Sequence, residues 1–566
     1  MTRPGWAAAL AAPYAAWMLI AFAAPLGAVL LMSVQENPEP FAPLSWTPDW
    51  INYQEIAGDS FLRRVIGNTI LLGAGVTIAS AILAYPIALW LTRLPARWRP
   101  WGFALILVPL LTNVVVRSLG IILLLSPTGV VSGAIQALGF ERPNLLFGWF
   151  AVGLALVQVF LPYMVLSLYD VLEAQEKRLT EAAQGLGAGP ATTFLKVVLP
   201  LSLPGLRAGL VVVFLLSSTA YVSATLVGGR QVWVSAMVVF REGLDNLNFP
   251  LASAMATVML GVAILVTLLI GRGISLAMPW AHGRKRRAPL LPVGLARVLH
   301  AAAEAVRPVL SPLLFAIGAA LLVFPLLLVV VASVNDTPQA TVAAFHGFTW
   351  RWYGLIFDNP RYLGDTWVSL QLAFATVLAG LLIALPAAFV LVRGAFPAKE
   401  ALGAAFLLPL ALPGIAVGLG MLRLLQWFTA VPAFLGILAV HVVLVAPFML
   451  VFLRASVAGL DRTLEEAAQG LGATRRQVLG RVILPQLAPG IAVACILGFL
   501  ISFGEVTVTA FLTTARLQTL PVRIYAEATF SLENTVNAIS TLTILLTIAL
   551  LLVLNRFVRL DRAWKR

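Results

Sequence analysis

The stretch EAAQGLGA occurs twice in this chain, at 181–188 and again at 466–473. Each copy continues without a gap to a Leu-Pro pair, Leu199-Pro200 in the first and Leu484-Pro485 in the second, so the two copies stay 285 residues apart. Strongly apolar segments flank both copies. A polar loop has therefore been duplicated together with the apolar segments around it, which divides the chain into two related halves.

The composition indicates that this chain lies in a lipid bilayer. Of its 566 residues, 60% are hydrophobic and only 11% are charged, which is far outside the range of soluble proteins. The net charge of +14 does not indicate nucleic-acid binding, because the basic residues stand at the ends of apolar segments and not in one domain. We expect an all-α integral membrane protein, since spans in lipid must satisfy their own backbone hydrogen bonds.

Twelve apolar segments are long enough to cross a bilayer. They fall near 13–34, 65–92, 101–125, 148–170, 206–227 and 252–274, and then near 309–333, 367–392, 400–428, 432–453, 488–512 and 536–558. The same order of elements in both sets predicts two parallel six-helix repeats, related by an axis along the membrane normal. We place the first half at 1–280, a basic cytoplasmic linker at 281–308 and the second half at 309–566.

Basic residues predict the orientation of the spans. The linker contains the run Arg284-Lys285-Arg286-Arg287, and the loops on the same side are rich in Arg, whereas the first outer loop is acidic. The positive-inside rule then puts both termini and both duplicated loops in the cytoplasm. The apolar run after Arg3 lacks a convincing cleavage site, so we interpret it as the first span and not as a signal peptide.

Several kinds of site are excluded. Cys495 is the only cysteine, so no intramolecular disulfide and no cysteine-based metal site can form, and we expect a buried, inert thiol. The four histidines lack metal-ligand spacing, and we expect His441 to be a satisfied packing residue. No Gly-x-x-x-x-Gly-Lys phosphate loop is present, so the chain cannot hold ATP in that way. No catalytic cluster indicates an enzyme.

Each duplicated loop is predicted to form a short helix, a glycine stop and a second short helix. In the first copy the helix carries Glu181 and ends at Gly185 and Gly187, because glycine adopts left-handed conformations without strain. Ala182 and Ala183 keep its surface small, so another backbone can approach. Such a loop could simply pack against its own spans, but the preservation of two copies favours docking into a groove of another protein.

The loop pattern resembles the EAA loop of permease subunits of bacterial ABC importers, although valine stands where the family often has isoleucine. The matching residues are Glu181, Ala182, Ala183, Gly187, Val197, Leu199 and Pro200 in the loop near 173–204, and Glu466, Ala467, Ala468, Gly472, Val482, Leu484 and Pro485 in the loop near 458–489. The resemblance implies a fused permease of the bacterial inner membrane. It also implies that each loop is a coupling helix, which docks on a cytoplasmic ATPase.

The same resemblance implies the partners of the chain. Two copies of the ATPase would bind ATP and Mg²⁺, so the chain itself needs no cofactor, and hydrolysis would take place on that separate subunit. A periplasmic binding protein would deliver the solute to outer loops that include 228–230 and 513–516. An ion-coupled secondary transporter is the alternative class, since it would account for the spans and repeats, but it would not explain the paired loops.

The fifth spans predict a passage for the solute. Glu505 aligns with Ala220 at the 285-residue offset. A carboxylate at membrane depth costs about 2.5–3.5 kcal/mol, so it faces a cavity or a partner. One carboxylate with aromatic and hydroxyl groups suits an organic cation, and an ion pair of Glu505 with Arg117 or Arg423 is the alternative. The candidate pathway residues are Glu505, Tyr221, Ser502, Thr507 and Ser223.

A narrower resemblance concerns the solute. The stretch 502–509, followed by 519–523, looks like the second permease of spermidine/putrescine importers, and the turn-rich segment that ends at 144–146 looks like the first permease of the same systems. This resemblance implies a polyamine or a similar small organic cation. Related permeases carry ferric iron, aminophosphonates, thiamine or sulfate, so these solutes stay open as alternatives.

Overall fold

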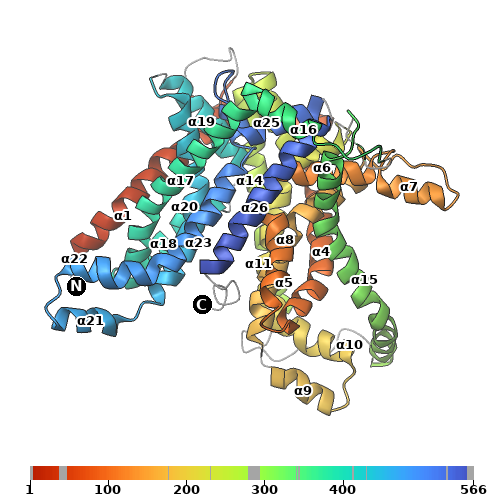
Figure 1. The fold of residues 1–566 in the computed structure, drawn as a ribbon, viewed down its shortest axis with the longest axis horizontal. Coiled ribbons are helices and arrows are strands. Elements are labelled where there is room, and N and C mark those ends of the chain that lie inside the picture. Colours follow the sequence, from red (N-terminus) through yellow and green to blue (C-terminus); the bar gives the residue numbers. More distant parts are fainter. Residues whose placement is uncertain are drawn as a thin grey trace.

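The computed structural model describes residues 4–36, 47–175, 177–229, 231–277, 293–338, 341, 345–410, 414–428, 430–530 and 533–557. In these ranges the regular structure is helical apart from two isolated β-bridges. Eleven described helices are long and apolar enough to cross a membrane, and there are twelve if the pair Lys399–Leu410 and Gly414–Trp427, bent by 87°, forms one span. The expected all-helical membrane architecture of about twelve spans is confirmed (Figure 1).

The first half contains six spans with shorter helices between them. Its helices are α1 (Pro4–Met18), α2 (Ala24–Ser33), α3 (Ile51–Gly58), α4 (Ser60–Arg93), α5 (Arg99–Leu111), α6 (Val114–Leu125), α7 (Val130–Ala137), α8 (Trp149–Ala174), α9 (Lys177–Gly185), α10 (Pro190–Thr193), α11 (Leu199–Ser218), α12 (Val222–Gly228), α13 (Ser235–Phe240) and α14 (Phe249–Ala277).

The second half repeats this order. Its helices are α15 (Val293–Ser333), α16 (Arg351–Asp358), α17 (Pro360–Arg393), α18 (Lys399–Leu407), α19 (Gly414–Trp427), α20 (Ala433–Ala458), α21 (Arg462–Gly470), α22 (Arg475–Val478), α23 (Leu484–Phe503), α24 (Thr509–Leu512), α25 (Leu520–Phe530) and α26 (Asn534–Phe557). We call residues 177–193 loop 1 and residues 462–478 loop 2, after the duplicated sequence that each contains.

A π-helical turn connects each loop to a fifth span. These turns are Phe194–Val198, before α11, and Leu479–Ile483, before α23. Proline lacks an N–H group and its ring crowds the carbonyl four residues earlier, so the helix widens ahead of Pro200 and Pro485. Each loop is therefore continuous with a long helix, and a displacement of the loop can reach the membrane part of the molecule.

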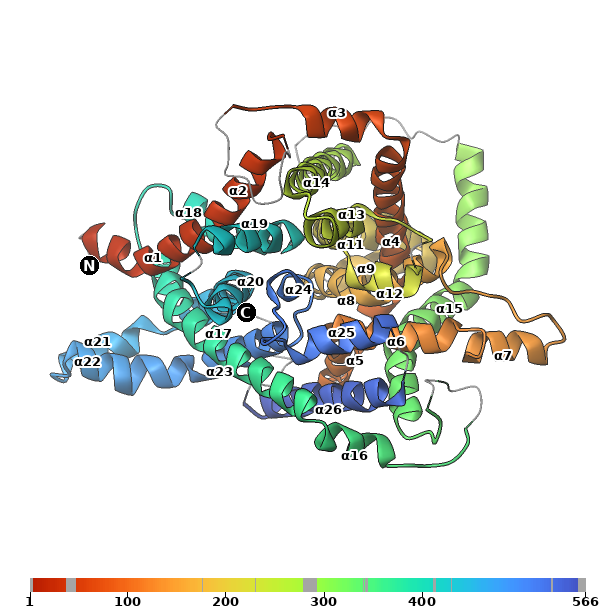
Figure 2. The ribbon, with the colours of Figure 1, turned by 90° about the horizontal axis from the view of Figure 1, so that it is seen from above.

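The first span of each half crosses to the other half. Helices α1 and α2 pack against α17 and α19, whereas α15 packs against α4 and α6 (Figure 2). The closest approaches are equivalent, because a side chain at Gly120 would overlap the carbonyl of Pro325 and a side chain at Gly420 would overlap that of Pro25. Both pairs keep one 300-residue offset, which supports two parallel repeats.

The predicted linker is in part a helix. Residues 281–292 lie outside the described residues, but residues 293–308 form the start of α15, which continues for 41 residues to Ser333. The predicted linker end at Pro308 lies inside this helix, so the secondary structure has no break there. The alanine-rich segment 300–305 has strong helix propensity, which outweighs one proline.

Candidate functional site

Loops 1 and 2 project from the same end of the molecule. Figure 1 shows α9 and α10 at the lower end of the first half and α21 and α22 at the lower end of the second. Helix α1 begins and α26 ends toward this same end, whereas α16 and α25 lie at the opposite end. Both loops can therefore be contacted from one side by another molecule.

The two loops have the same backbone. Helices α9 and α21 each contain nine residues and keep the 285-residue offset. Gly187 and Gly472 follow with φ of 82° and 84°. Ala188 N donates to Ala183 O over 3.1 Å, as in the glycine-terminated helix ends known as Schellman motifs, and loop 2 makes the matching bond over 3.0 Å. The predicted glycine stop is confirmed.

The conserved sequence of each loop is largely on its surface. Glu181 and Ala182 are exposed, Ala183 is half-buried, and Glu466, Ala467 and Ala468 repeat this order in loop 2. The leucine before each left-handed glycine is almost fully exposed, at 89% for Leu186 and 90% for Leu471. A leucine at this exposure gains no stability from the chain's own packing, and its equal exposure in both loops suits a contact with a partner.

A central cavity of about 570 Å³ lies between the two halves. It is lined by the junction of α5 and α6, by α8 and α11, and in the second half by Pro409, Leu410, Gly414, α20 and α23. Its polar lining residues are Thr112, Asn113, Arg117, Tyr163, Ser167, Asp170 and Thr219. Cavities at the interface of membrane repeats are where transporters hold their solutes, so this cavity is the candidate passage.

The break between α5 and α6 puts polar groups on the cavity wall. Thr112 is extended and ends α5, while the Asn113 side chain accepts a hydrogen bond of 2.7 Å from Val115 N and so begins α6. The Asn113 amide nitrogen and the Arg117 Nε are buried without a hydrogen-bond partner. Arg117 does donate through a terminal nitrogen to Val159 O, over 3.2 Å. These donors can bind a solute that carries acceptor groups.

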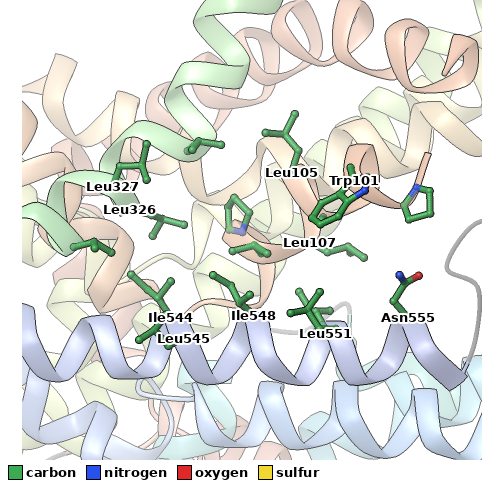
Figure 3. A pocket seen from close by; sticks show the side chains of 17 residues that line it. Trp101, Leu105, Leu107, Leu326, Leu327, Ile544, Leu545, Ile548, Leu551 and Asn555 are labelled. Carbon is green, nitrogen blue, oxygen red and sulfur yellow. The ribbon is translucent and has the colours of Figure 1, made fainter. Parts of the chain in front are cut away.

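A second cavity, of about 430 Å³, is apolar. Its wall comes from α5, α15 and α26, and Figure 3 shows Trp101, Leu326 and Ile548 among the side chains that surround it. Apart from Trp101, Asn555 is the one side chain in this lining that carries polar atoms. Because so few polar groups could orient a solute, this cavity is a poor candidate for the passage.

The predicted pathway residues do not line the central cavity. The Glu505 carboxylate accepts hydrogen bonds from the backbone N–H groups of Val508 and Thr509, each over 3.0 Å, and from Thr509 Oγ1 over 2.8 Å. It is neither on the wall nor paired with Arg117 or Arg423, because backbone donors at the start of α24 satisfy it. Gly504, its neighbour, does line the cavity.

The other four predicted residues do not line the cavity either. Tyr221 and Tyr525 share a hydrogen bond of 2.8 Å between their hydroxyls, Ser223 bonds Ser118 over 2.9 Å, and Ser502 bonds His441 over 2.8 Å. Thr507 is half-buried. His441 also bonds a threonine through its other nitrogen, which confirms it as a satisfied packing residue. Cys495 is half-buried, so the expected full burial is wrong.

Aromatic rings from both halves pack together around Tyr221, and we call Tyr221, Phe240, Phe511 and Tyr525 the aromatic layer. Tyr221 stacks on Phe240 with ring centroids 4.3 Å apart, and Phe240 meets Phe511 edge-on at 5.1 Å. Tyr525 completes the group from α25, which lies at the end opposite the loops (Figure 1). The layer therefore joins side chains of both halves, and α25 carries one of them at the end away from loops 1 and 2.

Sequence reasoning missed Asn113, Tyr163 and Thr219 as lining residues, and it considered Arg117 only as a partner for Glu505. A signal was present, because Arg117 is a charged residue inside an apolar span, which is the criterion that selected Glu505. Asp170, near the end of α8, is exposed and also lines the cavity.

Comparison with known proteins agrees with the two-half architecture. The chain is 32% identical to the spermidine/putrescine transport system permease protein PotB of Haemophilus influenzae, over 37% of this chain and 72% of that protein. It is 28% identical to PotC of the same organism, over 41% and 90%. It is 25% identical to the probable ABC transporter permease protein y4fN of Sinorhizobium fredii, over 89% of both chains.

A solved structure is also similar, that of a bacterial ABC transporter involved in the import of the acidic polysaccharide alginate, with 18% identity, a TM-score of 0.40 and coverage of 46% of this chain and 92% of that one. The family model for the binding-protein-dependent transport system inner membrane component matches residues 77–277 and again residues 377–564. The chain belongs to this family of ABC importer permeases, with both permease halves in one polypeptide.

Proposed function

We infer that this chain is the complete membrane passage of an ATP-driven importer and that two ATPase subunits act on loops 1 and 2. The observation that carries this inference is the pair of equal loops, which expose the same residues at one end of the molecule. ATP and Mg²⁺ belong to the ATPases, and a periplasmic binding protein supplies the solute at the other end.

The geometry suggests how the ATPases act on the passage. Each loop lies between two helices that line the central cavity, α8 and α11 for loop 1 and α20 and α23 for loop 2. When the ATPases close, they draw the loops together and move these four helices. The aromatic layer then opens and the cavity turns toward the binding protein. Hydrolysis releases the loops and returns the cavity to its present arrangement.

A polyamine or a similar small organic cation is the solute that we favour. PotB and PotC are named as spermidine/putrescine permeases, and this chain aligns with most of the length of each. In the cavity, the Asp170 carboxylate and the rings of Tyr163, Phe448 and Phe452 offer the charge and the aromatic faces that attract ammonium groups. Glu505 has no part in this proposal, because its carboxylate is satisfied elsewhere.

A solute with an anionic group is the second candidate, such as a sulfate or an aminophosphonate. The observation that favours it is the buried Arg117, which lines the cavity together with Asn113. The Arg117 Nε and the Asn113 amide nitrogen are both without a hydrogen-bond partner among the described residues. A guanidinium and an amide nitrogen are donors, so they attract oxyanions and repel ammonium groups.

The experiment that tests this function is uptake by proteoliposomes that contain the chain, its ATPase and its binding protein. We expect uptake that needs ATP inside and survives collapse of ion gradients. Uptake driven by a proton or sodium gradient without ATP would contradict the proposal. Asp170→Asn lowers uptake of a cation and Arg117→Gln lowers uptake of an oxyanion, so the pair of variants separates the two solute classes.

A further inference from the structure

The first turns of α15 reach loop 1. The two oxygens of Glu304 accept hydrogen bonds from Ala191 N over 2.9 Å and from Thr192 N over 2.8 Å. These amides stand at the start of α10, where a helix leaves its N–H groups without intrahelical acceptors. Glu304 belongs to the second half and loop 1 to the first half. The carboxylate therefore caps a helix of the other half across more than 110 residues of sequence.

The sequence of loop 1 leaves room for this carboxylate. The cap position is Gly189, and a side chain there would overlap the carboxylate of Glu304. Loop 2 has Thr474 at the matching position. Its side chain accepts from Gln477 N, while the Gln477 side chain accepts from Thr474 N over 2.8 Å, which is a capping box. Loop 2 thus caps itself, and loop 1 is capped from outside.

We propose that Glu304 is a positioning residue that ties loop 1 to α15. This inference rests on the proposed function, in which an ATPase acts on loop 1. Since α15 packs against α4, α6 and α26, a displacement of loop 1 moves helices of both halves at once. A displacement of loop 2 acts first on α23 of its own half, because its cap lies within the loop. The two loops are therefore equal in their docking surface and unequal in what they move.

The first test removes the cap. In proteoliposomes with the ATPase and the binding protein, Glu304→Ala lowers the number of solutes imported per ATP hydrolysed by about fivefold, the scale of a lost helix cap. Co-purification of the ATPase stays unchanged, because the exposed surface of loop 1 is intact. Hydrogen exchange on the permease alone becomes faster at Ala191 and Thr192 and is unchanged at Arg476 and Gln477. Unchanged exchange at Ala191 and Thr192 would overturn the contact itself.

The matched control is Thr474→Ala with Gln477→Ala, which removes the cap of loop 2. Exchange of the backbone amide at position 477 then rises, and the yield per ATP falls less than it does in Glu304→Ala, because no contact between the halves is lost. An equal fall in both variants would show that any cap has the same effect, and the tie to α15 would be wrong. If the proposed function is wrong and no ATPase acts on the loops, the result is different: the ATPase does not co-purify with the unmodified chain.

The second test separates two roles of Glu304, its role as a cap of α10 and its role as a contact between loop 1 and α15. Adding Gly189→Ser to Glu304→Ala gives loop 1 a side-chain cap of its own, since serine is favoured at this position and the carboxylate no longer occupies the space. We expect exchange protection at Thr192 to return while the solutes imported per ATP stay low. Full recovery of transport would mean that a local cap is sufficient, and it would overturn the proposed role of α15.

Discussion

Loops 1 and 2 share the same exposed surface and differ in their supports. The leucines at their tips are equally exposed and the glycines behind them have φ angles within a few degrees of each other. Loop 2 is held by its own half, since Arg393 of α17 forms an ion pair with Glu465. Thr180 stands at the matching position of loop 1, and Arg93, which matches Arg393, is exposed.

The supports of loop 1 come from other places. Glu304 caps it from the second half, and in its own half an ion pair of 3.0 Å between Arg99 and Glu173 holds the end of α8, the helix that precedes loop 1. The residues that face outward have stayed the same in the two copies while the residues that hold them have changed. This difference indicates that the outer surface is constrained by something that both loops contact alike, whereas the supports need only keep that surface in place.

The largest expected effect comes from Gly187 and Gly472 replaced together by valine. A β-branched residue at φ above 80° is strained by its backbone, so both helix ends refold and the docking surface is lost. We expect the ATPase to be absent from the purified complex. The matched control is Gly185→Ala with Gly470→Ala, at helical positions with open space, which should keep the ATPase. Retention of the ATPase in the valine variant would end the docking interpretation of both loops.

The next largest effect concerns the exposed leucines of the two loops, Leu186 and Leu471. Replacing Leu186 or Leu471 by alanine removes a side chain that the chain does not bury, so the thermal stability of the permease alone should not change. If a partner buries the leucine, each substitution weakens ATPase binding by about tenfold or more. Titration of the ATPase onto permease in nanodiscs measures this. Equal losses from both positions would support equal docking, while an effect at one position only would show that one loop carries the binding.

Much of the fold followed from periodic or local features of the sequence. Span number follows from apolar length, because a bilayer of fixed thickness needs about twenty residues. The helix ends at Gly187 and Gly472 could be predicted because glycine adopts positive φ angles without strain. The similar architecture of the two halves follows from the repeat, since elements that match at a fixed sequence offset are expected to occupy equivalent positions in each half.

What could not be predicted depends on tertiary packing. Nothing in the sequence near Glu304 indicates that it caps α10, since Glu304 lies more than a hundred residues from Ala191 and Thr192. Gly189, whose missing side chain leaves room for the carboxylate, does not by itself indicate a partner. Glu505 was misplaced because the amides of Val508 and Thr509 satisfy it once the chain bends after Phe503. The wall of the cavity depends on the break at Thr112 and Asn113, which the continuous apolar run of 101–125 conceals.

The ion pair between Arg393 and Glu465 can be removed without changing the exposed residues of loop 2. Arg393→Ala leaves the Glu465 carboxylate without its partner, and both side chains are more than four-fifths buried. We expect a loss of about 1–3 kcal/mol in the free energy of unfolding, measured by thermal unfolding in detergent, with faster exchange in α21 and no change in α9. Arg93→Ala is the control, because that side chain is exposed. A similar loss from both would show that charge alone, and not the pair, is responsible.

The smallest effect is a pH dependence confined to the start of α21. Asp461 accepts hydrogen bonds from the backbone and the hydroxyl of Thr463, and these bonds lower the pKa of its carboxyl below its ordinary value. A lowered pKa means that the cap is fully present above the ordinary value near 4 and is lost as the pH falls through the lower value of the folded chain. Exchange protection of the first turn of α21, corrected for intrinsic rates, should fall in that window, and Asp461→Asn should remove the dependence because asparagine caps without titrating. Protection that falls equally in the asparagine variant would assign the pH effect to another group and leave the support of loop 2 to Arg393 and the Thr474 cap alone.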